Sequence, residues 1–289
     1  MVTAVGYSAL VRGFRLALTV DGMRPHTVSC YVRDVQRLGD FLTPRPITKA
    51  TSSDIRAFLE HHGNGRCPKT VREAQLALRR FFRFLVQEGD ISKDPTAPVR
   101  LVKFQVVPQP AYFEAEVKRL LAVCSTKTLD GVRDYAALLV LYDTGVREGE
   151  LVSMEIPNWN TGTVRVSGKT GVRDVPLGVV TLQAVERYAR RWGIMEGSLW
   201  QGKKGTLTES GVLQMVQRRC QAAEVTYKGV HAFRRTAAAQ MKRLGMNDSD
   251  ILEVMGWKSI AMLRRYTATV AAELAHRAHN RHSPADSLR

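Results

Sequence analysis

The sequence has few cysteines and no long apolar segment. Its four cysteines, Cys30, Cys67, Cys124 and Cys220, are widely separated and form no C-x-x-C pair, so neither a zinc ribbon nor a disulfide scaffold is expected. The longest apolar run, residues 135–142, falls well short of the roughly 20 residues that cross a membrane. Arginines interrupt the apolar N-terminal stretch, so a signal-peptide core is lacking. These absences favour a reduced, cytoplasmic protein with no membrane partner.

Negative charge is scarce relative to positive charge. The chain carries 27 Asp and Glu against 43 Lys and Arg, a net charge of +16. A split near residue 105 gives 17 basic and 9 acidic residues before it, and 26 and 18 after it, so each part carries +8. Such an excess attracts polyanions. Nucleic acid is therefore the expected partner, ahead of an anionic membrane or a ribosome-like surface, and a nucleoid-associated location follows.

Motifs for metal or nucleotide chemistry are also missing. Gly168-Lys169-Thr170 imitates the end of a phosphate-binding loop, but position 163, where that motif needs glycine, is Thr. The pair His61-His62 has no neighbouring ligand set. Neither H-E-x-x-H nor an acidic cluster suited to two Mg²⁺ ions is visible. We therefore expect no cofactor and no metal.

The length of 289 residues favours two domains. Helical spacing of apolar residues predicts a helical domain over residues 1–104, with a helix N-cap pattern at Thr51-Ser52-Ser53-Asp54 and another helix from near Pro68 to Gly89. Clustered prolines mark the connection, and residues 105–111 are predicted to be the linker. The second domain is predicted to cover residues 112–289.

The second domain is predicted to be mainly helical with a small antiparallel sheet. Three short runs of β character, at residues 149–156, 162–166 and 173–176, predict that sheet. Lys169 is expected on a hairpin turn between the last two runs. From Leu182 to about Ala278 the pattern returns to helices, and a polar tail follows. The predicted fold class is therefore mainly α with a small antiparallel β-sheet in the C-terminal domain.

Four arginines accompany the apolar face of the helix that begins near Pro68. They are Arg72, Arg79, Arg80 and Arg83. A solvated helix face is an ordinary reading of any one of them. As a set within a segment of charge +8, they predict contacts with DNA phosphates.

The second half contains a series of cationic residues that a tyrosine closes. The members, in chain order, are Arg147, Lys169, His231, Arg234, Trp257 and Tyr266. Each alone is a weak signal, because an arginine on a helix is usually a surface residue and a tryptophan usually belongs to a core. His231 and Arg234 are three residues apart, which places them on one face of a helix. The order and spacing of the whole set give it meaning.

The set and its surroundings resemble the tyrosine recombinase (phage integrase) family, in size its Xer-type members. The matching stretches are Thr27-x-x-x-Tyr31, 76–85 and 89–95 in the first half, and 142–151, 166–169, 231–238, 255–259 and 265–266 in the second. The resemblance covers roughly residues 8–278. It implies a helical core-binding (SAM-like) domain followed by an α+β catalytic domain with a C-terminal helix and tail.

The resemblance also implies roles for the residues that match the family motifs. Tyr266 would attack a DNA phosphodiester and form a 3′-phosphotyrosyl link. A phenol has an ordinary pKa of about 10, so this attack needs cationic neighbours and a base. Arg147 and Arg234 would bind the non-bridging phosphate oxygens, because a planar guanidinium donates in a bidentate fashion and stays charged.

The remaining matched residues receive supporting roles from the same resemblance. Lys169 would protonate the 5′-oxygen leaving group, with Lys258 as an alternative cation nearby. His231 would assist proton transfer from the tyrosine or hydrogen-bond the phosphate. Trp257 would donate its indole N–H to phosphate, and Glu150 would orient the site. This chemistry conserves the energy of the phosphodiester bond, so it needs no metal and no nucleotide.

The function implied is a site-specific recombinase or integrase that acts as a homo-tetramer on two DNA sites and is a monomer or weak oligomer when free. Its two domains would enclose the duplex. Two alternatives are a catalytically silent DNA-binding protein of the same fold and a type IB topoisomerase-like enzyme. The intact set of site residues argues against the first, and the recombinase-like first domain against the second. Residues 267–278 show a short amphipathic pattern, which predicts a helix that packs either on its own domain or on a neighbouring protomer.

Overall fold

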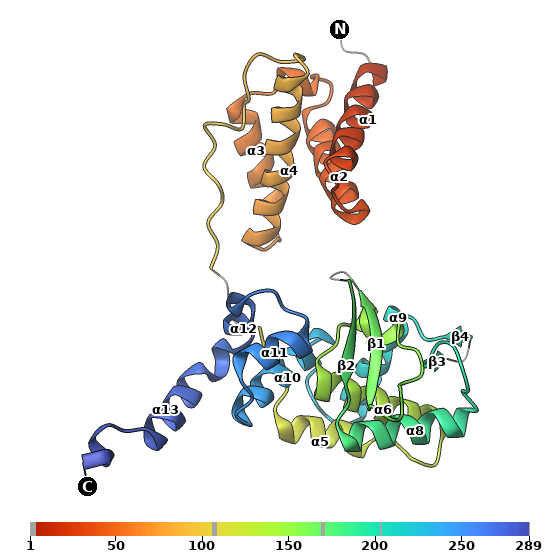
Figure 1. Cartoon of the computed structure of the whole chain (residues 1–289). Coiled ribbons are helices and arrows are strands. Elements are labelled where there is room, and N and C mark those ends of the chain that lie inside the picture. The colour runs from red at the N-terminus through yellow and green to blue at the C-terminus, as the bar shows by residue number, and fades with distance from the viewer. Residues whose placement is uncertain (1–3, 106–108, 169–170, 203, 289) are drawn as a thin grey trace. The chain divides into compact units, whose positions relative to one another are not determined.

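The computed structural model describes residues 4–105, 109–168, 171–202 and 204–288 (Figure 1). The chain divides into two compact units, Met1–Val106 and Val107–Arg289. Both are mainly helical, and small two-stranded antiparallel sheets occur in the second, so the predicted fold class is confirmed. Among the helices described, none is both long and apolar enough to cross a membrane.

The first unit is a helical bundle around one apolar core. Its described elements are α1 (Ala4–Val20), α2 (Pro25–Leu42), the short 3-10 helix η1 (Ile47–Lys49), α3 (Ser52–Gly63) and α4 (Pro68–Gln87). Apolar residues at helical spacing on each helix meet in this core. Phe14 of α1 and Phe81 of α4 pack edge to face at its centre, with ring centroids 5.2 Å apart.

Local chemistry sets the ends of α3 and α4. The Thr51 hydroxyl accepts from the backbone N–H of Asp54, and the Asp54 carboxylate accepts from the backbone N–H of Thr51 at 2.7 Å. Pro68 occupies the first position of α4, where its missing N–H costs nothing. Gly89 follows that helix with a left-handed φ of +81°. Both helices expected from these signals are confirmed.

The second unit is built around a buried central helix. Its described elements are α5 (Glu114–Ala122), α6 (Leu129–Thr144), α7 (Glu148–Val152), β1 (Thr163–Gly168), β2 (Gly171–Pro176), α8 (Val179–Trp192), β3 (Gln201–Gly202), β4 (Gly205–Thr206), α9 (Glu209–Ala222), α10 (His231–Arg243), α11 (Asp248–Met255), α12 (Ile260–Thr267), η2 (Ala268–Val270), α13 (Ala271–Arg281) and η3 (Ala285–Leu288). Residues 136–141 of α6 are all buried, so this helix packs against neighbours on every side.

Strands β1 and β2 form the larger of the two sheets. They pair antiparallel, with Thr163 opposite Pro176 and Gly168 opposite Gly171. Val164, Val166 and Val175 point into the core and are at most 1% exposed. The strands expected at 162–166 and 173–176 are therefore confirmed. The strand expected at 149–156 is wrong, because helix α7 occupies its first half.

The helix at this position begins through a side-chain contact that a β-type residue pattern does not reveal. Arg147 precedes α7 in an extended conformation, and its backbone N–H donates to Glu150 Oε2 at 2.9 Å. Leu151 of α7 is fully buried. Capping by Glu150 and burial of Leu151 together outweigh the weak β preference of the segment.

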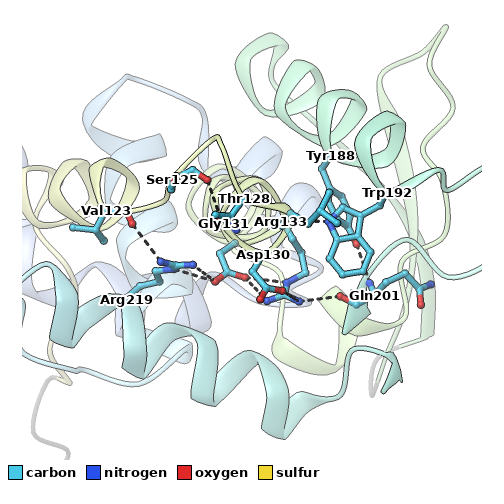
Figure 2. A network of polar contacts seen from close by, with 12 residues as sticks. Val123, Ser125, Thr128, Asp130, Gly131, Arg133, Tyr188, Trp192, Gln201 and Arg219 are labelled. Carbon is cyan, nitrogen blue, oxygen red and sulfur yellow. Dashed lines mark hydrogen bonds and ion pairs between the residues drawn. The ribbon is translucent and has the colours of Figure 1, made fainter. Parts of the chain in front are cut away.

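A buried polar network fastens α6 to α9 and to strand β3 (Figure 2). The Asp134 carboxylate accepts two hydrogen bonds from Arg133 and two from Arg219, all between 2.7 and 2.9 Å. Arg133 also donates to the Gln201 carbonyl at 3.1 Å. Asp134 is 2% exposed and Arg133 4% exposed, so this charge cluster lies inside the unit. The network therefore joins α6, α9 and β3 inside the second unit.

Helix α13 differs from the other helices of the second unit because it buries none of its residues. Figure 1 shows it leading away from the remaining helices of that unit. Arg243 of α10 forms a surface ion pair with Glu273 of α13, at 2.7 Å. A helix with so little packing gains little stability from its own unit.

Candidate active site

The residue pair at the centre of the site is Tyr266 and His231. Tyr266 lies on α12, whose buried residues Leu263 and Thr267 face the protein interior, and it is itself half-buried. His231 is the first residue of α10. The Tyr266 hydroxyl and His231 Nε2 lie 2.6 Å apart, a strong hydrogen-bond distance. The structure therefore brings together two residues that the sequence separates by 35 positions.

The surroundings of His231 favour its neutral form. Partial removal of its ring from water, followed by the charges of Arg234, Arg235 and Arg147, lowers its pKa from 6.5 to about 4. Although burial is the larger cause, the residue as a whole remains exposed, and the charges of the three arginines act on its ring as well. A neutral imidazole protonated on Nδ1 has an acceptor at Nε2 and can accept the Tyr266 hydroxyl proton.

Arg234 lies completely inside the protein, 0% exposed. Its Nη1 donates to the Gly145 carbonyl at 2.6 Å, and its Nη2 donates to the Met255 carbonyl. Within the described part of the chain, Arg234 takes part in no ion pair, and its Nε has no hydrogen-bond partner. Burial, followed by the charge of Arg147, lowers the pKa of Arg234 to about 10, so its guanidinium stays charged at neutral pH.

Two glycines allow the backbone to surround Arg234. Gly145 ends α6 and Gly256 ends α11, both with a left-handed φ of +61°. A Cβ on Gly145 would lie 2.9 Å from Met255 Cε and 3.0 Å from Ala237 Cβ. The ends of α6 and α11 therefore approach α10 closely enough for their carbonyls to receive the guanidinium.

Trp257 follows Gly256 and lies between the other site residues. Its ring centroid is 4.7 Å from that of Tyr266 and 5.0 Å from the Arg234 guanidinium carbon. The side chain is 7% exposed, and its indole Nε1 has no hydrogen-bond partner in the described part of the chain. Such orphaned buried donors are uncommon, and here two of them, on Trp257 and Arg234, belong to adjacent side chains.

Arg147 is positioned by Glu150. Besides the backbone contact at the start of α7, Arg147 Nη1 donates to Glu150 Oε1 at 2.5 Å. The same carboxylate accepts two bonds from Arg173 of β2, at 2.7 and 3.1 Å. Burial alone raises the pKa of Glu150, but the hydrogen bonds from Arg173 and from the Arg147 backbone outweigh it and lower the pKa to about 2. Glu150 is therefore an anion in the free protein.

The remaining residues expected at the site have different outcomes. Lys169 lies outside the described residues. Lys258 is exposed on the turn after Trp257. The sequence did not indicate two residues near the site, Arg173 and Arg235. The charge of Arg235 acts on His231, and its Nε donates to the Pro110 carbonyl at 2.7 Å. The available signal for Arg173 was a single arginine within the predicted strand that follows Lys169 in the sequence.

The arginines expected to contact DNA from α4 are partly engaged within the first unit. Arg72 and Arg79 donate to the carbonyls of Val102 and Val99, at 3.0 and 2.6 Å, and so fix the chain that follows the bundle. Arg80 forms an exposed ion pair with Asp21. Arg83 is exposed on the same helix. Their contact with DNA stays a prediction.

Comparison with known families identifies the family of the chain. Residues 113–273 match the model of the phage integrase family, and residues 12–89 match the phage integrase N-terminal SAM-like domain. The chain belongs to the phage integrase family. The resemblance to tyrosine recombinases, and with it the enzyme class of a tyrosine-type site-specific recombinase, is confirmed. Within this phage integrase, Tyr266, His231, Arg234 and Arg147 all lie inside the matched range of the second unit.

Individual relatives agree with the assignment of the chain to this family. The chain is 28% identical to a protein named tyrosine recombinase XerC of Pelobacter propionicus over 89% of both chains. It is 25% identical to one named tyrosine recombinase XerD of Listeria monocytogenes, covering 89% of this chain and 93% of that one. A lambda integrase dimer bound to a core site superposes with a TM-score of 0.76 at 19% identity, over 90% of this chain and 76% of that one. This last likeness supports the fold alone.

Proposed function

We propose that this phage integrase cleaves and rejoins DNA through a covalent 3′-phosphotyrosyl intermediate on Tyr266. The observation that carries the proposal is the 2.6 Å contact between the Tyr266 hydroxyl and a neutral His231, directly beside the buried Arg234. In the cleavage step the Tyr266 oxygen bonds to phosphorus, and the bond from phosphorus to the 5′ oxygen breaks. Rejoining reverses these changes, with a 5′ hydroxyl as the attacking group.

The cleavage step needs two proton transfers, one from the attacking Tyr266 hydroxyl and one to the departing 5′ oxygen. His231 accepts the proton that Tyr266 loses, which its lowered pKa permits at neutral pH. The departing 5′ oxygen takes up a proton, for which we propose Lys169 as donor on the basis of the sequence motif alone. No metal is needed to activate either oxygen in this scheme.

Stabilisation of the transition state comes from donors that are already in place. The phosphate oxygens gain negative charge as phosphorus becomes pentacoordinate, and Arg147 and Arg234 would donate to them. The orphaned Nε of Arg234 and Nε1 of Trp257 offer two further N–H groups beside Tyr266. Because these groups are fixed by packing and hydrogen bonds before DNA arrives, little reorganisation is required on binding.

The partner is double-stranded DNA with specific recombination sites, which both units bind. Each part of the chain carries a charge of +8, and Arg83 of α4 is exposed for phosphate contact. Solved lambda integrase structures include a dimer bound to a core site and a tetramer bound to a Holliday junction. We propose the same stoichiometry here, a tetramer on DNA in which α13 packs on a neighbouring protomer.

A nicked suicide substrate tests the proposal, because loss of the short 5′ product prevents religation and traps the covalent complex. Wild-type protein should form an adduct stable to denaturant, and Tyr266→Phe should form none while binding DNA normally. Tyr142→Phe is a matched control, since Tyr142 accepts from Gln240 and lies away from His231. An adduct with Tyr266→Phe would assign the nucleophile elsewhere. Absence of any wild-type adduct on its own site would favour the DNA-binding protein without catalysis.

A further inference from the structure

Arg173 has no role in the chemistry described above, yet it contacts two of the segments that build the site, α7 through Glu150 and the turn at Gly256. It lies on β2, and its side chain is 15% exposed. Both of its terminal nitrogens donate to the Glu150 carboxylate, at 2.7 and 3.1 Å. The bidentate geometry fixes the plane of the carboxylate as well as its position.

Each oxygen of the Glu150 carboxylate accepts hydrogen bonds from both Arg147 and Arg173. Oε1 accepts from Arg147 Nη1 at 2.5 Å and from Arg173 Nη1 at 2.7 Å. Oε2 accepts from the Arg147 backbone N–H at 2.9 Å and from Arg173 Nη2 at 3.1 Å. The plane that Arg173 imposes on the carboxylate is therefore the plane that orients the guanidinium of Arg147.

Close packing leaves this arrangement little freedom. A Cβ on Gly168 would lie 2.8 Å from Glu150 Cγ, so the end of β1 presses directly on the glutamate side chain. A Cβ on Gly256 would lie 2.9 Å from Arg173 Nε, so the turn that carries Trp257 presses on the arginine from another side. Ser153, directly after α7, adds a reciprocal pair of bonds to Ser167 of β1, at 3.0 and 3.1 Å.

We propose that Arg173 is a positioning residue for recombination, which orients Arg147 through the shared Glu150 carboxylate. This inference rests on the proposed function of Arg147 as a phosphate ligand. Its contribution acts on the rate of cleavage and leaves DNA binding intact, because Arg173 itself touches protein groups only among the described residues. It also joins α7 to the hairpin strands that flank the Lys169 position.

The test measures single-turnover cleavage of the nicked substrate at saturating DNA, with the dissociation constant determined separately. Arg173→Ala should slow cleavage on the order of 10–100-fold and change the dissociation constant less than about 2-fold. The matched control is Arg165→Ala, because Arg165 lies on the same hairpin in an exposed pair with Asp174 and should cleave like wild type. Arg173→Lys, which keeps one charged donor, should recover part of the rate and covers the case in which the alanine variant does not fold.

A double-mutant cycle distinguishes positioning through Glu150 from general loosening of the fold. In a Glu150→Ala background, Arg173→Ala should slow cleavage by less than about 2-fold further, because the carboxylate that transmits its effect is gone. An equal loss in both backgrounds, or cleavage by Arg173→Ala at the wild-type rate, overturns the inference.

A crystal structure of free Arg173→Ala separates this inference from the proposed function. The Glu150 carboxylate should rotate, and the contact from Arg147 Nη1 to Oε1 should lengthen beyond hydrogen-bond distance. If wild-type protein forms no covalent adduct, the proposed function fails, and this structure still decides the inference. An unchanged Arg147–Glu150 contact in the variant overturns it.

Discussion

His231 Nε2 lies 2.6 Å from the Tyr266 hydroxyl within a single chain. The proposed base and nucleophile therefore come from one protomer. Helices α10 and α12 pack directly against each other, and the rings of the two residues form an edge-to-face pair with centroids 5.7 Å apart. The pairing of these two residues is a property of the folded second unit, and DNA would supply the phosphate of the proposed reaction.

The first prediction concerns the pKa of His231. In the free protein its imidazole should titrate near pH 4, whereas an ordinary histidine titrates near 6.5, and NMR of ring protons can follow this with His231→Gln for assignment. Since the folded-state pKa is lowered, the neutral form stabilises the fold above pH about 6.5, and this stability is lost as pH falls toward 4. Arg235→Ala removes a nearby charge and should raise the pKa. A titration near 6.5 in wild type would contradict the electrostatic argument.

The second prediction concerns the geometry of Arg234. Arg234→Lys keeps the charge but cannot bond the Gly145 and Met255 carbonyls and the phosphate together, so cleavage at saturating DNA should fall on the order of 100-fold or more. Arg243→Lys is the control on the same helix, because Arg243 pairs with Glu273 at the surface. Cleavage by Arg234→Lys at close to the wild-type rate would show that charge alone suffices.

The third prediction concerns the buried network of Figure 2. Asp134→Ala leaves Arg133 and Arg219 without their shared carboxylate and should lower the free energy of unfolding of the second unit by about 3–5 kcal/mol. All four tryptophans belong to that unit, so denaturant unfolding followed by tryptophan fluorescence reports on it. Asp174→Ala, which breaks an exposed pair, should cost no more than about 1 kcal/mol. Equal losses in the two variants would show that burial of the network is unimportant.

The fourth prediction decides between the two roles expected for the C-terminal helix. Deletion of residues 271–289 removes no buried residue of α13 and should change the unfolding free energy of the second unit by about 0.5 kcal/mol or less. The same deletion should leave single-site binding intact and abolish the higher-order complex on DNA, as sedimentation can measure. A loss of more than about 2 kcal/mol would instead show that the helix packs on its own unit.

Much of the fold could be predicted because its signals are local. The capping pair Thr51–Asp54 and Pro68 are close in sequence to the helices they start, and the alternation of Val164 and Val166 shows on which side β1 is buried. Helix α7 could not be predicted in this way. Its first residue follows Arg147, which is not a residue type that marks a helix start, and the Glu150 carboxylate that caps it is held by Arg173, 23 positions along the chain.

The candidate site divides in the same manner. Its proposed residues Arg147, His231, Arg234 and Tyr266 could be selected because their order and spacing match a family pattern. The sequence could not indicate that Arg234 lies inside the protein, nor that Arg173 shares Glu150 with Arg147. Those features depend on contacts between segments far apart in the chain, and residue type alone does not determine such contacts.

The burial of Arg234 among backbone carbonyls has a thermodynamic consequence. A guanidinium in the interior costs free energy that a carboxylate partner would normally offset, and within the described chain the ion pairs leave this one out. In the described part of the chain the nearest influence of this kind is the Glu150 carboxylate, whose charge acts on Arg234 without an ion-pair contact, and a bound phosphate would supply a direct counter-ion. By linkage, whatever free energy a bound phosphate gains from Arg234 returns to the folded state as added stability, so this buried cation would couple the melting temperature to the occupancy of the proposed DNA site.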